Sequence, residues 1–312
     1  MDPGRSGIGG VVKRMAPLLG LAAFAVALVM IHRLAGRMDL AELTRRLART
    51  PRPALLSALA LTVGSYLSLS GFDGLGVRYV GHRLAPGRVM LISFIAHGVS
   101  HSTGFATLSG GAIRLRLYGV AGLTASEIAA VIGFCGLTFA AGACAVAAVA
   151  LLAEPTRLAA LFALPDGILR GLGAVIAAMV AGYVLWGASS PRPLRIFGRH
   201  YAVPGPPMAL AQIVVAAVDL ALAAGALYVL LPAGGGISYA AFLGVYVVAN
   251  LLGLLAHVPG GLGVFEAAVL ALIPAPAPAV LSALLLFRAV YNLLPLALAA
   301  LCLLAFELSQ GR

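Results

Sequence analysis

Charged residues are scarce in this chain of 312 residues. Asp, Glu, Lys and Arg make up 10% of it, whereas soluble domains carry about 25%. Hydrophobic residues make up 62%, and the mean hydropathy is +1.04. These values exclude a soluble globular domain and indicate helices that cross a bilayer. The sequence therefore predicts an all-α fold, a polytopic transmembrane helix bundle.

Lysine is nearly absent, because Lys13 is the only one and the net charge of +11 comes almost entirely from arginine. In a membrane protein such an excess of positive charge meets anionic lipid headgroups. No basic stretch is interleaved with aromatic residues, so nucleic acid is not an expected partner.

Cysteine is also rare. Cys135, Cys144 and Cys302 each lie inside an apolar segment, which is typical of small buried residues and not of a disulfide framework or a metal site. No Cys/His cluster has metal-ligand spacing, and no nucleophile–base motif occurs. We therefore expect no metal, no cofactor and no catalytic residues.

The apolar segments predict a single transmembrane domain over residues 16–308, preceded by a flexible basic N-terminus at 1–15. The run 16–31 has no cleavage signature and is expected to be an uncleaved first span, followed by an interfacial amphipathic helix at 38–50. The seven expected spans, one of them short, are 16–31, 54–71, 128–153, 171–190, 208–231, 238–257 and 279–306. The arginines do not settle the orientation of the chain in the membrane. Whether the N-terminus is placed on the cytoplasmic or on the outer side, some arginine-rich loop falls on the side that the positive-inside rule disfavours.

Two further segments, 89–113 and 258–274, do not resemble simple spans. The first is uncharged but rich in histidine, serine and glycine. A helix facing lipid would not have this composition, so each segment is expected to be broken or re-entrant and buried in the bundle.

The stretch from His257 to Glu266 interrupts the second of these segments. Pro259 removes a backbone donor, and Gly260 and Gly261 leave helical geometry easily. A broken helix followed by a buried acid favours a substrate site with a gate or hinge. The alternative is a surface loop with Glu266 at a helix start.

Three charged residues, Asp219, Glu266 and Arg288, are expected near the middle of the bilayer. Each costs about 2.5–3.5 kcal/mol there on insertion scales. One interpretation is that they line a substrate path, since such costly groups usually serve transport. The other is that Glu266 and Arg288 form a structural ion pair.

A second constellation follows Gly110 and Gly111, which are expected to form another hinge. Arg114 and Arg116 come next, and their guanidinium groups could hold a lipid phosphate; the alternative is ordinary cytoplasmic anchoring. Gly110-Gly111 precedes Arg116 by the same offset at which Gly260-Gly261 precedes Glu266. Two interrupted segments in the two halves favour a repeat-built transporter.

The chain resembles a known family at five ordered places. These are Tyr66 to Asp73 with Arg78-Tyr79, then Gly110 to Tyr118, Asp219 ahead of Leu230-Leu231-Pro232, His257 to Glu266, and Phe287-Arg288 with Tyr291 and Pro295. The family is the transmembrane flippase region of bacterial lysylphosphatidylglycerol synthetases, the multiple peptide resistance factors, with its stand-alone membrane relatives. The resemblance covers roughly residues 16 to 308.

This resemblance implies an integral membrane lipid translocase that moves an aminoacylated or other phospholipid between leaflets of the bacterial cytoplasmic (inner) membrane. It implies importance for Asp73, Asp219, Glu266 and Arg114. The chain lacks the aminoacyltransferase domain, so it is not expected to be an enzyme. The further partners that this interpretation suggests are a lipid synthase and a second copy of the chain in a homo-oligomer. The alternative function is a scaffold that docks a lipid-modifying enzyme without transport.

Overall fold

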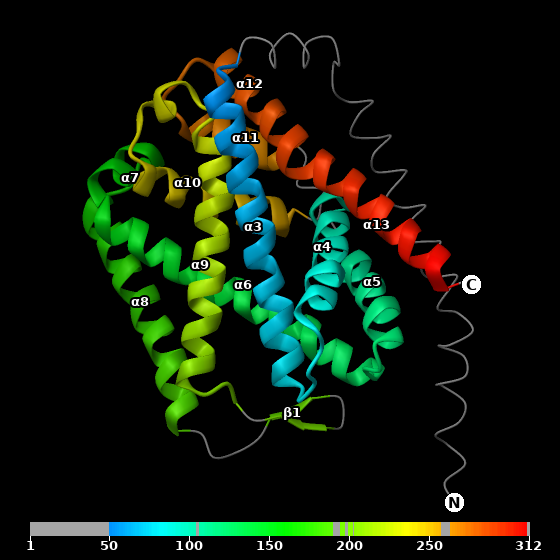
Figure 1. The fold of residues 1–312 in the computed structure, drawn as a ribbon. Helices are drawn as coiled ribbons and strands as arrows, with labels where there is room; N and C mark the ends of the chain where they lie inside the picture. The colour runs from blue at the N-terminus through cyan, green and yellow to red at the C-terminus, as the bar shows by residue number, and fades with distance from the viewer. Residues whose placement is uncertain are drawn as a thin grey trace, which may run out of the picture.

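The computed structural model describes residues 50–103, 106–189, 194–196, 199–201, 203–256 and 263–310. The predictions for residues 1–49 and the hinge residues Pro259, Gly260 and Gly261 lie outside this part. The helices, labelled as in Figure 1, are α3 (Arg52–Tyr79), α4 (Pro86–Thr103), α5 (Ala106–Val120), α6 (Ala125–Ala153), α7 (Pro155–Phe162), α8 (Asp166–Ser189), α9 (Pro206–Tyr228), α10 (Tyr239–Leu255), α11 (Val264–Leu272), α12 (Ala277–Phe287) and α13 (Leu294–Gln310).

The predicted fold class, a polytopic bundle of apolar helices, is confirmed. Among the described residues, five helical stretches are long and apolar enough to cross a membrane, and the last of them runs unbroken over Ala277–Ser309. Helix α3 has 28 residues, a length of about 42 Å, against about 30 Å of bilayer hydrocarbon. Helix α10, with 17 residues, is shorter. The only strands described, β1 (Leu194–Ile196) and β2 (Arg199–Tyr201), form a small antiparallel ribbon between α8 and α9.

The centre of the bundle is the antiparallel pair α3 and α9 (Figure 1). Helices α6 and α8 cover one side of this pair, and α4, α5 and α13 cover the other. The side chains between the helices, including Phe72, Leu220 and Phe242, are almost fully buried. The same central pair carries the buried carboxyl groups Asp73 and Asp219.

The first interrupted segment is a helical hairpin of α4 and α5, which pack side by side (Figure 1). Gly110 and Gly111 were predicted to be a hinge, and this prediction is wrong, because both lie inside the regular helix α5. A β-carbon at Gly110 would collide with Ser100 Oγ of α4 and lie 3.3 Å from the Ala96 carbonyl oxygen. The glycine therefore allows close packing of the hairpin and does not bend it.

The second interrupted segment is broken in the described residues as well. Helix α10 ends at Leu255, and the nine-residue helix α11 begins after Gly263, whose φ is +88°. Glycine adopts this left-handed conformation without the steric cost that other residues carry. Helix α11 packs against α10 and ends before an extended Ile273. It is too short to cross a bilayer by itself.

Helix α6 begins with the capping box that its sequence favours. The Thr124 hydroxyl accepts from the Glu127 backbone N–H, and the Glu127 carboxylate accepts from the Thr124 N–H at 2.8 Å. Glu127 also lies 3.2 Å from His82 Nε2. Glu127 therefore has a structural role at the start of α6.

Helices α6 and α9 approach each other closely at Gly142. A β-carbon there would collide with Ala216 of α9 and lie 3.0 Å from the Ala216 carbonyl carbon. We expect Gly142→Val to lower the free energy of unfolding by about 1–3 kcal/mol, the usual cost of overpacking, in reversible unfolding from detergent micelles. Gly136→Val on the same helix is the control, since no heavy atom lies within 4 Å of its β-carbon. Equal losses in the two variants would contradict the packing argument.

Candidate functional site

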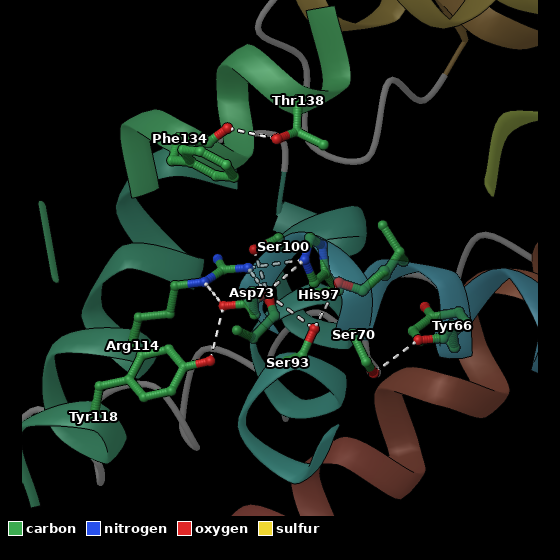
Figure 2. A network of polar contacts seen from close by, with 12 residues as sticks. Tyr66, Ser70, Asp73, Ser93, His97, Ser100, Arg114, Tyr118, Phe134 and Thr138 are labelled. Carbon is green, nitrogen blue, oxygen red and sulfur yellow. Dashed lines mark hydrogen bonds and ion pairs between the residues drawn. The ribbon is translucent and has the colours of Figure 1, made fainter. Parts of the chain in front are cut away.

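The most buried charged side chain among the described residues is Asp73 of α3, whose exposed fraction is 0%. Arg114 of α5 binds it with both arms of its guanidinium group. Nε donates to Oδ1 and Nη2 to Oδ2, each at 2.7 Å. Figure 2 shows the arginine reaching Asp73 from one side. This bidentate geometry is the strongest form of a carboxylate–arginine contact.

Three more side chains surround the same carboxylate, and we call the five residues together the Asp73 cluster. The Ser93 hydroxyl donates to Oδ2 at 2.9 Å and the Tyr118 hydroxyl to Oδ1 at 3.1 Å. His97 Nε2 lies 3.2 Å from Oδ2. Both oxygens are fully hydrogen-bonded, as a buried carboxylate requires. The cluster attaches the α4–α5 hairpin to α3.

Arg114 and Arg116 do not form the joint phosphate clamp that the sequence favours. Because α5 is a regular helix, residues two apart point about 200° away from each other. Arg116 turns toward α13, where its Nε and Nη2 donate to the Glu307 carboxylate at 2.9 and 2.7 Å. Each arginine already binds a carboxylate, so a lipid phosphate would have to displace Asp73 or Glu307.

Asp219 of α9 has different surroundings. The Ser65 hydroxyl donates to its Oδ1 at 2.5 Å and lies 2.8 Å from the Tyr291 hydroxyl. The Tyr66 hydroxyl donates to the Tyr291 carbonyl oxygen at 3.2 Å. We call these four residues the Asp219 cluster. Within the described part of the chain, no lysine, arginine or histidine contacts Asp219.

Glu266 and Arg288 form the ion pair that was one of the two interpretations of these residues. Arg288 Nε donates to Glu266 Oε1 at 2.6 Å, and the guanidinium lies over the Phe265 ring, 5.6 Å from its centroid. The second carboxylate oxygen accepts from the Gly263 N–H at 2.8 Å. Glu266 thus caps α11 and also connects it to Arg288, which directly follows α12.

Two histidines connect the Asp73 and Asp219 clusters. The His97 and His101 ring centroids are 5.7 Å apart, and His101 stacks on Tyr291 at 5.8 Å with an interplanar angle of 12°. The turn that holds Tyr291 is π-helical, from Arg288 to Leu293 (η3), and such turns occur often at functional sites. Among the described residues, His101 Nδ1 and Asn292 Oδ1 are buried without a hydrogen-bond partner.

Sequence reasoning did not identify the roles of these α4 residues, although a signal is present. Ser93, His97 and His101 follow one another at intervals of four, which places them on one face of a helix. Glu307 and Ser65 have no comparable signal, because each meets its partner across the bundle. Within the described part of the chain, no group of three His, Cys, Asp or Glu residues is arranged to hold a metal ion.

An apolar cavity of about 340 Å³ lies beside the Asp219 cluster. Its walls come from α3, α4, η3 and α13, and include Tyr66, Met90 and Phe94. Val63 and Leu298, at its edge, are 53% and 46% exposed. Tyr66 therefore separates an apolar opening on the surface from the buried polar residues behind it.

The helices and the buried charges define a multi-pass helical membrane protein. No family model matches the chain. It is 39% identical over 262 residues to the uncharacterized protein slr0712 of Synechocystis, an alignment that covers 83% of this chain and 81% of that protein. It is 32% identical over 294 residues to the inner membrane protein YbhN of Escherichia coli, covering 93% and 91%. The chain belongs to the family that includes these two proteins.

Proposed function

We propose that this protein moves a phospholipid, aminoacylated or otherwise, between the leaflets of a bacterial inner membrane. The name of the relative YbhN supports this membrane. The resemblance to the flippase region of lysylphosphatidylglycerol synthetases supports the lipid substrate. The protein is proposed to act as a transporter and not as an enzyme.

The observation that carries the proposal is the apolar cavity next to the Asp219 cluster. Its volume falls at the lower end of the range of about 300–1,000 Å³ typical of ligand pockets. In a bilayer its exposed edge faces lipid chains, because Val63 and Leu298 lie on the outer side of the helices. An acyl chain would fill the cavity while the headgroup reaches the polar residues behind Tyr66. This juxtaposition suits an amphipathic molecule.

The charged residues have distinct proposed roles. Asp219 would receive the amine of a cationic headgroup, because it is buried and has no cationic side chain bound to it among the described residues. Arg114 and Arg116 would contact the lipid phosphate only when their carboxylate partners move aside. The ion pair of Glu266 and Arg288 would hold α11 in place beside this path.

Filling the cavity tests the proposal. We expect Val63→Trp to reduce leaflet exchange of acyl-labelled phospholipids in liposomes by about tenfold or more, since losing about 1.4 kcal/mol of substrate binding already changes an affinity tenfold. Val214→Trp on α9 is the matched control, because Val214 is 57% exposed and does not line the cavity. Both variants should unfold at the same temperature in detergent.

Two outcomes would overturn the proposal. Wild-type protein that produces no more leaflet exchange than empty liposomes would exclude a translocase and favour the scaffold. Equal exchange by Val63→Trp and Val214→Trp would exclude this cavity as the path. Co-purification with a lipid synthase and crosslinking between copies of the chain would test the proposed partner enzyme and homo-oligomer separately.

A further inference from the structure

We propose that Asp219 binds either a proton or the cationic amine of a lipid headgroup, so that lipid movement is coupled to proton movement in the opposite direction. The proposal rests on the proposed lipid translocase and names its source of energy. It starts from the contrast between the two buried carboxyl groups, Asp73 and Asp219, on adjacent helices of one bundle.

The first part of the argument is the absence of charge around Asp219. It is the only charged residue of α9, and α10 and α12, which pack against α9, have none. The helices α6 and α8 also pack against α9. They carry charges only near their first residues, which are Glu127 in α6 and Asp166 and Arg170 in α8.

The titratable side chains close enough to feel the charge of Asp219 are tyrosines. Tyr66 faces it from α3, Tyr246 from α10 and Tyr291 from η3. The positive charge of Arg288 is close enough to influence Tyr246 electrostatically, but Arg288 is bound to Glu266. On α3, Asp73 is bound to Arg114. An isolated carboxylate is too costly to keep in such surroundings, and a buried acid there becomes neutral by binding a proton.

Asp73 is the internal comparison. It is even more deeply buried than Asp219, but the two bonds from Arg114 neutralise its charge. A proton would have to displace the guanidinium group, so the Asp73 cluster is expected to stay ionised and structural. Asp219 has only hydroxyl groups around it. Hydroxyl groups can reorient to donate to a carboxylate or to accept from a carboxylic acid.

Buried polar groups connect the histidines of α4 with Asp219. His101 Nδ1 and Asn292 Oδ1 are buried and have no hydrogen-bond partner among the described residues, and buried polar groups of this kind are costly unless a polar molecule meets them. His101 stacks on Tyr291, whose hydroxyl contacts Ser65 next to Asp219. These side chains form a buried series of polar groups that leads to Asp219, and chains of acids and histidines conduct protons in transporters.

The exchange balances in charge. The neutral carboxylic acid of Asp219 loses its proton to water when an ammonium headgroup arrives, and the resulting carboxylate pairs with the ammonium. When the lipid leaves on the other side, the carboxylate takes up a proton again. One positive charge replaces another at every stage, so the buried site never holds an uncompensated charge.

Liposomes with an imposed pH gradient test the coupling. We expect the rate of exchange of acyl-labelled lysylphosphatidylglycerol to change by up to about tenfold per unit of pH gradient. Each pH unit is a tenfold difference in proton concentration across the membrane. Labelled phosphatidylglycerol, which lacks the amine, should not respond. Asp219→Asn should remove the gradient response, whereas Asp166→Asn, on α8 with 41% of its side chain exposed, should keep it. Exchange that ignores the gradient in wild-type protein would overturn the coupling and leave the translocase intact.

An infrared measurement decides whether Asp219 carries the proton. We expect the wild-type protein to show the carbonyl band of a protonated carboxylic acid that Asp219→Asn lacks and that lysylphosphatidylglycerol diminishes. A wild-type spectrum without this band would overturn the proposal even if lipids are exchanged. If no lipid is exchanged at all, the translocase itself fails and the proposed coupling fails with it.

Discussion

Asp73→Asn is expected to lower the free energy of unfolding by about 3–5 kcal/mol, the usual cost of breaking one partner of a buried ion pair. The amide would present a donor to one arm of the Arg114 guanidinium, where the carboxylate presents only acceptors. Arg114 is 5% exposed, so its charge would remain in the bundle without compensation. The loss should appear as unfolding at lower denaturant in mixed micelles.

Two further variants separate the ion pair from other effects. Asp73→Leu combined with Arg114→Met removes both charges and should restore most of the stability, because apolar replacements of a buried pair are often neutral or better. Arg116→Gln on the same helix should cost about 2 kcal/mol, less than a fully buried pair, since the Arg116 and Glu307 side chains keep 10% and 17% of their surface exposed. A double variant less stable than Asp73→Asn alone would show that Ser93 and Tyr118 need the carboxylate itself.

The fold class follows from the sequence because hydrophobic length is a local property. The runs that become α6 and α9 are each longer than a bilayer needs and carry no interior charge except Asp219. The interruption of 258–274 was also predictable, because Gly263 can adopt a positive φ at little cost. The hinge at Gly110 was predicted wrongly. A glycine serves equally for bending and for close packing, and only the position of Ser100 on the neighbouring helix distinguishes the two.

The site was harder to predict because its contacts join distant parts of the chain. Asp73 and Arg114 were each identified, yet nothing in the sequence pairs residues 41 positions apart. Asp219 and Ser65 are 154 positions apart. Arg116 was expected beside Arg114, but helix geometry and Glu307, 191 positions away, direct it elsewhere. Partner choice of this kind depends on how the helices pack in three dimensions.

Glu266→Gln is expected to cost about 2 kcal/mol of stability, less than the roughly 3–5 kcal/mol of a fully buried pair, because the Glu266 side chain keeps 19% of its surface exposed. The variant loses the charge that faces Arg288 Nε at 2.6 Å. Its amide oxygen can still accept from the Gly263 N–H, so the start of α11 should survive. Unfolding in mixed micelles and leaflet exchange in liposomes, measured on the same preparations, give the two readouts.

The combined change Glu266→Gln with Arg288→Gln distinguishes a structural pair from a residue that binds the headgroup. A structural pair predicts that the double variant regains part of the lost stability and exchanges lipid at a rate near wild type, because no charge is left unmatched. A headgroup role for Glu266 predicts the reverse, with little loss of stability in Glu266→Gln and no lipid exchange in either variant. The bond between Arg288 and Glu266 and the position of Arg288 over Phe265 favour the first pattern. That result would leave Asp219 as the carboxyl group expected to meet the substrate.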